Sequence, residues 1–136
     1  MRPLNAEDEA LLSAARAAAA NAYCPYSRFP VGAVVQTERG RFAGCNVENA
    51  SYSLGVCAER SAIHNAVAAG ARAFVRLVVS CTAATESDPP GSRMPCGACR
   101  QVIAEFMAPD AEVIVDGAGA WTVRELLPAA FRLARP

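Results

Sequence analysis

The fold of this chain is decided by two stretches of its sequence, CAER at residues 57–60 and PCGACRQ at residues 95–101. An apolar run with helical periodicity follows each stretch, which predicts that a helix begins at each of them. Cys57, Cys96 and Cys99 therefore lie at predicted helix N-termini. Unpaired backbone N–H groups and the positive end of the helix dipole favour thiolate over thiol there. The three cysteines are for this reason candidates for metal ligands.

The spacing of these cysteines suits a single metal ion. Cys96 and Cys99 can hold one tetrahedral ion, and Cys57 can supply a third ligand from the other helix. Three protein ligands leave a fourth position for water, which is typical of a catalytic site rather than of a closed structural site. Glu59, two residues after Cys57, is close enough to exchange a proton with that water. The sequence therefore predicts a catalytic metal site with an adjacent acid.

The composition indicates one compact domain over residues 1–136. Of the 136 residues, 53% are hydrophobic and 19% are charged, which provides enough apolar surface for a core. The formal net charge is zero, so no general attraction to nucleic-acid phosphates or to anionic lipid is expected. We therefore expect neither a nucleic-acid polymer nor a membrane as a partner.

The N-terminal segment lacks the form of a signal peptide or a membrane span, because its alanine run at residues 17–20 follows the acidic residues 7–9. A cytoplasmic location is the resulting expectation. In a reducing compartment, the six cysteines favour metal binding over disulfides. Cys24, Cys45 and Cys81 lie in apolar surroundings and are interpreted as small buried side chains.

Hydrophobic periodicity predicts alternating helices and strands. Helices are expected over residues 6–22, 57–69, 97–107 and 123–133, and strands over residues 31–37, 41–47, 74–81 and 112–115. The continuous apolar run at residues 74–81 is typical of a strand that is covered on both faces. Strands that alternate with helices predict an α/β sandwich with parallel crossovers around each ligand-bearing helix.

Two irregular stretches near the first cysteine are candidates for ligand binding. Residues 46–52, NVENASY, place polar groups at a strand end just before a cysteine-bearing helix. Turn formation is the alternative role of Asn46 and Asn49. Residues 23–30 carry three aromatic residues and two prolines, and this aromatic loop is either a packing plug or one wall of a pocket.

Other interpretations of the cysteines are open at this point. A redox site leaves Cys57 unexplained, and a structural zinc site needs Cys45 as a fourth thiolate and gives no role to Glu59. His64, inside a helical run, is interpreted as a packed or half-exposed residue. Arg60 is either a surface residue or a partner of the thiolates, because three thiolates on Zn²⁺ leave a negative charge that a guanidinium group can offset.

Three motifs together resemble the small, homotetrameric, three-cysteine cytidine deaminases: NVENASY at 46–52, CAER at 57–60 and PCGACRQ at 95–101. PYSRF at 25–29 and LLPAAF at 126–131 extend the resemblance over nearly the whole chain. Cys24 and the pair Gly55-Val56 depart from the residues that are usual in that family. The resemblance implies a three-layer α/β/α sandwich with a mixed sheet of about five strands.

The resemblance also implies a mechanism. Cys57, Cys96 and Cys99 would hold one Zn²⁺ per subunit, and the bound water would ionise near neutral pH. Glu59 would move the proton of this water to N3 of the pyrimidine while hydroxide attacks C4, and would then carry a second proton to the departing amine. Arg60 would hydrogen-bond the thiolates. The expected products are uridine and ammonia.

The residues that would contact the substrate, by the same resemblance, are Phe29, Asn46, Glu48, Ala58 and Phe131. Asn46 and Glu48 would hydrogen-bond the ribose 3′-hydroxyl, which selects free nucleosides over nucleotides inside a polymer. Phe29 would pack on the base or sugar. Phe131 would reach the pocket of a neighbouring subunit in a homotetramer with shared active sites.

The expected activity is the deamination of cytidine and deoxycytidine in pyrimidine salvage. A deaminase of blasticidin S or of free cytosine is the alternative, although a ribose-binding motif is superfluous for a free base. A non-enzymatic zinc module, with Cys45 as its fourth ligand, is the lower-ranked alternative.

Overall fold

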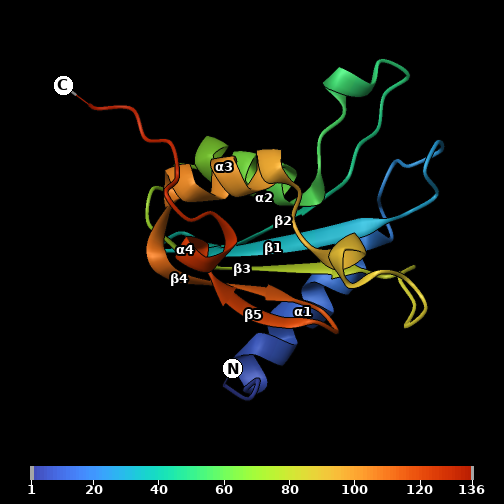
Figure 1. Cartoon of the computed structure of the whole chain (residues 1–136), viewed down its shortest axis with the longest axis horizontal. Helices are drawn as coiled ribbons and strands as arrows, with labels where there is room; N and C mark the ends of the chain where they lie inside the picture. Colours follow the sequence, from blue (N-terminus) through green and yellow to red (C-terminus); the bar gives the residue numbers. More distant parts are fainter. Residues whose placement is uncertain (1, 136) are drawn as a thin grey trace.

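The computed structural model describes residues 2–135, which contain one five-stranded sheet and four α-helices (Figure 1). The helices are α1 (Ala6–Ala19), α2 (Ala58–Ala68), α3 (Gly97–Phe106) and α4 (Val123–Leu126), with the short 3-10 turns η1 (Tyr52–Leu54) and η2 (Pro90–Arg93). The strands are β1 (Val31–Thr37), β2 (Gly40–Cys45), β3 (Phe74–Cys81), β4 (Met107–Val115) and β5 (Gly119–Thr122).

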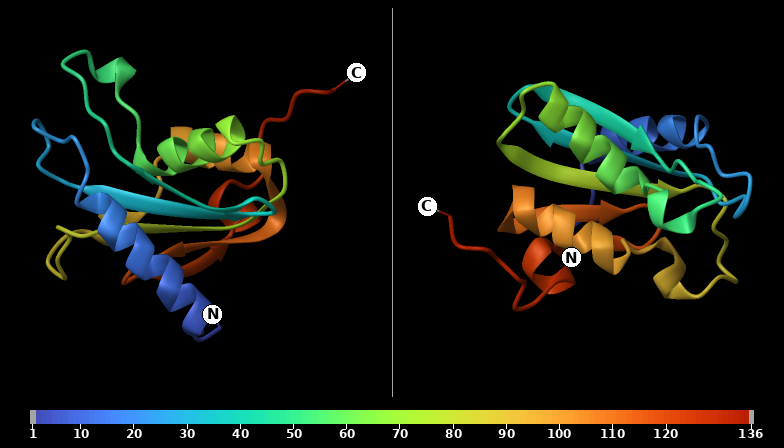
Figure 2. Two further views of the ribbon diagram at one scale, coloured as in Figure 1. Left: turned by 180° about the vertical axis from the view of Figure 1, so that it is seen from behind. Right: turned by 90° about the horizontal axis from the view of Figure 1, so that it is seen from above.

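The elements form three layers. Figure 2 shows α1 on one face of the sheet and α2 and α3 side by side on the other face. The predicted α/β/α sandwich with a mixed sheet is therefore confirmed. Within residues 2–135, no helix combines the length and the apolar character that crossing a bilayer requires.

The order of the strands across the sheet is β2-β1-β3-β4-β5. β1 is antiparallel to both β2 and β3, β3 is parallel to β4, and β5 is antiparallel to β4. β2, β3 and β4 therefore run in the same direction, and the helices that connect them, α2 and α3, both begin at the same edge of the sheet. These are the two predicted parallel crossovers, and they bring both cysteine stretches to that edge.

Alternation along the central strands gives the sheet two apolar faces. The smaller core lies between α1 and the sheet and contains Leu11, Leu12, Ala15, Val34, Val78 and Ile114. The larger core lies under α2, α3 and α4 and takes the alternate strand residues Ala33, Val35, Leu77, Val79, Val113 and Val115. Each fully buried Leu, Ile or Val stabilises the fold by about 1.5–3 kcal/mol. Apolar packing therefore holds α2 and α3 on the sheet, and a hydrogen bond from Asn65 of α2 to the carbonyl oxygen of Ala43 in β2 adds to it.

β2 and α2 approach each other closely at Gly44. A Cβ atom at Gly44 would lie 2.2 Å from the backbone nitrogen of Ala62 and 2.7 Å from the carbonyl oxygen of Ala58. No residue with a side chain fits this space, because the atoms that it would meet belong to the helix backbone. Gly44 thus sets the distance between the strand and the helix that carries Glu59.

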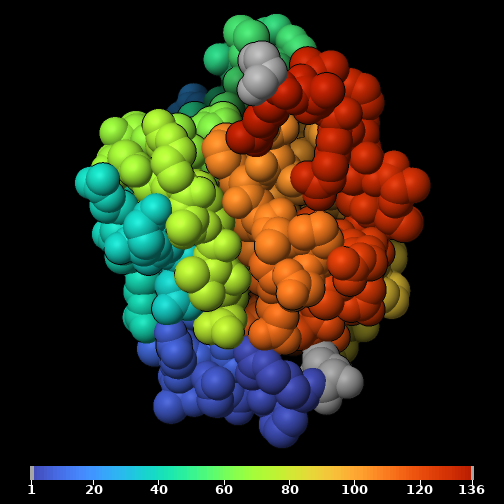
Figure 3. Space-filling view, turned by 90° about the vertical axis from the view of Figure 1, so that its left-hand side faces the viewer, coloured from blue at the N-terminus to red at the C-terminus, as the bar shows by residue number. Residues whose placement is uncertain are grey.

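The predicted terminal helix over residues 123–133 begins where expected, but its predicted extent is wrong. α4 ends at Leu126, and the backbone of Leu127, with φ −143° and ψ 78°, is not helical. The reason is Pro128, which disfavours helical backbone at the residue before it. The residues that follow lie along α3 instead, as Figure 3 shows for the red and orange segments.

Other predicted boundaries differ by a few residues. α1 ends at Ala19 and not at residue 22, which is a usual shift for a fraying helix end. β2 ends at Cys45, and Val47 makes only isolated bridges beyond it. β4 begins at Met107 and not at residue 112, because Met107 pairs with Phe74 before an irregularity in the register.

α1 begins with a capping box and a buried charge. The Asn5 side chain accepts a hydrogen bond from the backbone of Asp8, and the Asp8 carboxylate accepts one from the backbone of Asn5, both at 2.9 Å. Asp8 is fully buried and also forms ion pairs with Arg2 and with Arg76 of β3. The hydrogen bond from Arg2 is the main reason that the pKa of Asp8 falls from 3.8 to about 2.

Replacing this carboxylate should make the stability of the protein less dependent on pH. Asp8→Asn is expected to reduce the free energy of unfolding at neutral pH by about 1–2 kcal/mol, because Arg2 and Arg76 each lose one of their two carboxylate partners and keep only Glu112. The folded-state pKa of Asp8 lies below its unfolded value, so its stabilisation is complete above pH 3.8 and is lost as the pH falls toward about 2. Urea unfolding followed by circular dichroism should show the two proteins converging over this range.

The control for this variant is Glu9→Gln, which removes an exposed carboxylate from the same helical turn. It should change the free energy of unfolding by less than about 0.5 kcal/mol. A loss of stability in Asp8→Asn that stays constant down to low pH would contradict the role given to the carboxylate.

Candidate metal centre

The three predicted metal ligands meet where α2 and α3 begin. Cys57 is the N-cap residue of α2, Cys96 is the N-cap residue of α3, and Cys99 lies in the first turn of α3. The Sγ atoms of Cys57 and Cys96 are 3.9 Å apart, and those of Cys96 and Cys99 are 3.4 Å apart. All three sulfurs lie within 4.8 Å of one another, and residues 2–135 contain no other such group of His, Cys, Asp or Glu.

This geometry fits a zinc ion. With Zn–S bonds of about 2.3 Å, tetrahedral coordination places neighbouring sulfurs about 3.8 Å apart, which is close to the separations in the cluster. Only three donors of the described chain gather there, so a fourth position is left for a ligand that is not protein. The donor set therefore suits one Zn²⁺ per chain in a catalytic arrangement.

The surroundings of the cluster favour loss of a proton. A hydrogen bond with Cys99 and a second one from Arg60 lower the pKa of Cys57 to about 5. The pKa of Cys99 is raised instead, because the hydrogen bond with Cys57 and burial favour its protonated form. A cation that binds all three sulfurs displaces their protons, as is usual for thiolate ligands.

Arg60 lies in the first turn of α2 and faces the thiols. Its Nη2 atom donates to Sγ of Cys57 at 3.4 Å, and its Nε atom is buried without a hydrogen-bond partner among the described residues. Three thiolates on a divalent cation carry a net charge of minus one, which a guanidinium group at this position offsets. The structure thus places Arg60 against Cys57, a predicted metal ligand, and not on the open surface.

Glu59 is buried beside the cysteine cluster, with only 4% of its surface exposed. Burial raises the pKa of Glu59 to about 7, and the negative charge of Cys57 adds to this rise. A carboxyl group with this pKa gains and loses a proton readily at neutral pH. This is the property that a general acid–base residue needs.

A cavity of about 230 Å³ lies against Glu59 and collects most of the predicted site. Its walls come from the aromatic loop, the ends of β2 and β3, the start of α2, and η2. The predicted site residues that line it are Phe29, Asn46, Glu48, Cys57, Ala58, Glu59 and Cys96. The aromatic loop is therefore a cavity wall, and Cys99 and Arg60 lie behind the residues that face the cavity.

Asn46 holds the backbone of the aromatic loop in place. Its Oδ1 atom accepts from the backbone nitrogen of Val31 at 2.8 Å, and its Nδ2 atom donates to the carbonyl oxygen of Phe29 at 3.0 Å. The amide thus bridges both sides of Pro30 and positions Phe29 at the cavity. One N–H and one lone pair of the side chain are left for a ligand.

Glu48 supports the same loop from the other side. Its Oε1 atom accepts from the backbone nitrogens of Tyr26 and Ser27, each at 3.1 Å. Hydrogen bonds from the Ser27 hydroxyl and backbone, followed by the one from Tyr26, lower the pKa of Glu48 below its ordinary value. Glu48 therefore presents an ionised acceptor at the cavity.

The wall formed by β3 and η2 was not predicted from the sequence. Val79, Cys81 and residues 92–94 line the cavity there. Cys81, interpreted from the sequence as a small buried side chain, is half-buried, and burial raises its pKa to about 11. The available signal was its position at the carboxyl end of a parallel strand, where cavities of α/β proteins form. Nothing in the local sequence marks residues 92–94.

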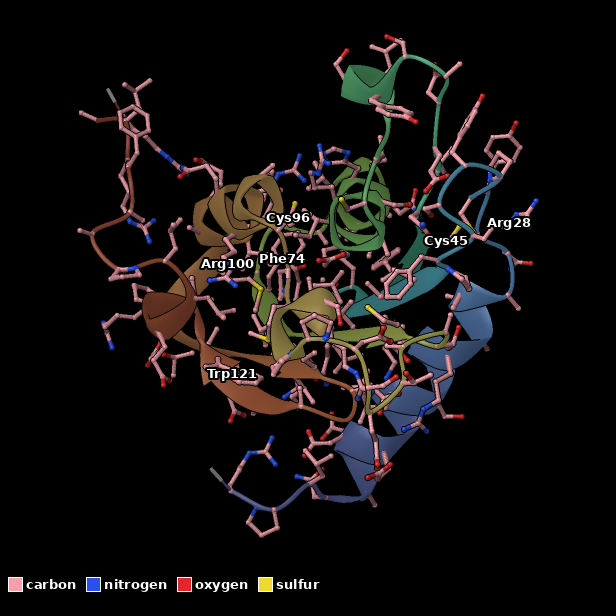
Figure 4. The ribbon with its side chains drawn as sticks, turned by 45° about the vertical axis from the view of Figure 1, so that its right-hand side comes forward. Arg28, Cys45, Phe74, Cys96, Arg100 and Trp121 are labelled. Carbon is pink, nitrogen blue, oxygen red and sulfur yellow. The ribbon has the colours of Figure 1, made fainter. Side chains whose placement is uncertain are left out.

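Cys24 and Cys45 are also half-buried and not buried as predicted, because Cys24 lies in the aromatic loop and Cys45 is the last residue of β2. Cys45 is outside the cysteine cluster, and in the view of Figure 4 it lies on the opposite side of α2 from Cys96. The closed zinc site with Cys45 as fourth ligand is therefore absent from the described chain. His64 is exposed on α2 and does not line the cavity.

Phe131 is the one predicted substrate residue that lies away from the cavity of its own chain. It is 70% exposed, and its carbonyl oxygen accepts a hydrogen bond from Nε2 of Gln101 at 3.0 Å. Arg132 donates to the carbonyl oxygen of Ala104 at 2.9 Å. The C-terminal segment is thus attached to α3 with the Phe131 ring turned to solvent.

Comparisons with known proteins agree with this site. The family model of the cytidine and deoxycytidylate deaminase zinc-binding region matches residues 5–115. A cytidine deaminase from Sporosarcina psychrophila is 44% identical over 128 residues, which cover 90% of each chain.

Solved structures give the same result. The cytidine deaminase from Burkholderia pseudomallei has a TM-score of 0.80 at 45% identity and covers 90% of this chain and 98% of that chain. The cytidine deaminase from Mycobacterium tuberculosis has a TM-score of 0.79 at 37% identity and covers 95% of this chain and 100% of that chain. With its three-cysteine cluster and buried acid, this chain belongs to the cytidine and deoxycytidylate deaminase family.

Proposed function

We propose that this protein catalyses the hydrolytic deamination of cytidine and deoxycytidine, with residues 1–136 acting as one catalytic domain. The observation that carries the proposal is the buried carboxyl group of Glu59 next to an open three-cysteine cluster at one cavity. The relatives named as cytidine deaminases support the same substrate class. The products are uridine or deoxyuridine and ammonia, as in pyrimidine salvage.

Glu59 performs the proton transfers in this reaction. Cys57, Cys96 and Cys99 would hold a Zn²⁺ ion, which would act as a Lewis acid and lower the pKa of a water molecule to near neutrality. Glu59 accepts the proton of the attacking water and donates it to N3 of the pyrimidine, which makes C4 electrophilic. It then carries a second proton to the 4-amino group, which leaves as ammonia.

The polar residues at the cavity suit a ribose. Asn46 has an amide N–H available, and Glu48 presents an ionised acceptor, so the pair can bind the 3′-hydroxyl. The negative charge of Glu48 repels a phosphate at that position, which favours free nucleosides. Phe29 offers an aromatic face to the base or sugar, and Ala58 lies at the start of α2 without a bulky side chain.

A homotetramer with shared active sites is part of the proposal. Tyr52, Leu54 and Phe131 are 81%, 67% and 70% exposed, and large apolar side chains at this exposure favour contact with another chain. Phe131 is proposed to enter the cavity of a neighbouring subunit. The cytoplasm is the proposed location, because metal-binding cysteines must remain reduced.

Glu59→Gln should abolish most of the activity without loss of the metal. We expect kcat for cytidine to fall by about 10²–10⁴-fold, because an amide cannot accept or deliver the proton. Zinc content, measured by atomic emission, should equal that of the parent protein, since Glu59 is not a ligand. Undiminished uridine production, followed by the absorbance change, would refute the proposed function. Glu86→Gln, an exposed loop residue, is the control.

Glu48→Gln tests the ribose contact. The amide oxygen can still accept from Tyr26 and Ser27, but the charge-assisted bond to the sugar is lost, so KM for cytidine should rise by about tenfold. Assays of cytidine, deoxycytidine, cytosine and blasticidin S with the parent protein give the substrate order. If either of the last two is preferred, the nucleoside assignment is wrong.

Phe131→Ala tests the contribution of a neighbouring subunit. Light scattering should give a tetramer for the parent protein, and the variant should show a KM about three- to tenfold higher with little change in kcat. Leu133→Ala, which removes another exposed apolar side chain from the same segment, should leave KM unchanged. A fully active monomer would rule out shared sites.

A further inference from the structure

Residues 92–94 form one wall of the substrate cavity at the end of η2. Among the described residues, the hydrogen bonds of residues 82–94 stay within this segment or reach Cys81. The one side-chain bond to Cys81 is long, with 3.9 Å between its Sγ atom and the carbonyl oxygen of Arg93. Backbone hydrogen bonds therefore do little to hold this wall against the sheet.

The side chain of Arg93 provides a further contact, with the turn between β4 and β5. A Cβ atom at Gly117, in the turn between β4 and β5, would lie 2.3 Å from Nη1 of Arg93. The guanidinium group therefore rests on the bare Cα of Gly117, whose φ of 77° also favours glycine. The carboxylate of the neighbouring Asp116 attracts the guanidinium group of Arg93. The pKa of Asp116 is lowered mainly by the hydrogen bond from Arg16 and also by the one from Ser80, and the positive charge of Arg93 lowers it further.

Arg93 also separates the substrate cavity from two other spaces. It lines the cavity of about 230 Å³, a second one of about 360 Å³ beside Asp116, and a third one of about 470 Å³ beside Trp121. Gly117 lines the second and third cavities but not the substrate cavity. A substitution at Gly117 can therefore affect substrate binding only through a neighbouring residue. Arg93 is the side chain that lines all three cavities.

We propose that Arg93 is a positioning residue for the substrate: its guanidinium group, seated on Gly117 beside Asp116, fixes residues 92–94 and thereby sets the width of the substrate cavity. The proposal rests on the proposed deaminase function. Because Arg93 shapes the wall and takes no part in proton transfer, its loss should weaken binding of substrate and transition state alike. Such a loss raises KM and leaves kcat nearly unchanged.

The test compares two glycines with positive φ. Gly117→Ala displaces the guanidinium group, whereas Gly40→Ala introduces similar backbone strain at φ 102° with no atom within 4 Å of the added Cβ. Gly117→Ala and Arg93→Ala should each raise KM for cytidine about three- to tenfold, with kcat within about twofold of the parent. Gly40→Ala should leave KM unchanged.

A double variant shows whether the two residues act together. Once Arg93→Ala has removed the guanidinium group, Gly117→Ala has nothing to displace, so the double variant should have the KM of Arg93→Ala alone. If the increase in KM of the double variant equals the product of the two single increases, the residues act independently and the proposal is wrong. An unchanged KM in Arg93→Ala would overturn it as well.

Trp121 gives a measurement that does not depend on turnover. It is the only tryptophan of the chain, lines the third cavity together with Arg93 and Gly117, and lies well away from Cys96 in Figure 4. Quenching of its fluorescence by acrylamide should increase in Arg93→Ala and in Gly117→Ala, and should stay at the parent value in Gly40→Ala.

The two readouts separate the possible failures. Increased quenching with unchanged KM would mean that the wall moves without affecting the substrate, and the positioning role would be wrong while the proposed function stands. Unchanged quenching in Arg93→Ala would refute the attachment itself. If the parent protein does not deaminate cytidine, the proposed function fails and the positioning role falls with it, even where quenching responds as expected.

Discussion

The common direction of β2, β3 and β4 is the constraint on which the site depends. Helices that connect parallel strands must begin at the same edge, so the N-termini of α2 and α3 converge there. Each N-terminus carries unpaired N–H groups and partial positive charge, which favours negatively charged ligands. The three cysteines occupy this convergence, and Arg60 adds a full positive charge to it. Topology and electrostatics therefore act at the same point.

The sequence was most informative where a pattern is local. The cysteine spacing and the helical runs after residues 57 and 96 predicted the cluster, and the apolar run of β3 predicted a strand covered on both faces. The terminal helix failed because composition favoured a helix through residue 133 while the single residue Pro128 prevented it. Local sequence strongly constrains where a helix starts, but a proline can end it anywhere.

The missed part of the site is non-local. Cys81 and Arg93 reach the cavity only because β3 and the segment after it fold back toward α2, and no motif connects them to the cysteines. The half-burial of Cys24 and Cys45 has the same origin, since an apolar neighbourhood in sequence does not tell where the sheet stops covering a side chain. Asn46 shows that two roles which the sequence presents as alternatives can coexist. Its amide hydrogen-bonds the backbone on both sides of Pro30, as a turn-forming residue does, and it also lines the cavity.

The close contact between β2 and α2 has a chemical consequence. Glu59 has a high pKa because it is buried, and its depth depends on how near the first turn of α2 lies to the strand. At Gly44 the backbones of strand and helix are in contact. We expect any larger residue to push the helix away from the strand, expose the carboxyl group of Glu59 to water and lower its pKa toward that of an ordinary glutamate. Gly44 lies outside both the cysteine cluster and the cavity, and we expect its lack of a side chain to contribute to the high pKa of Glu59.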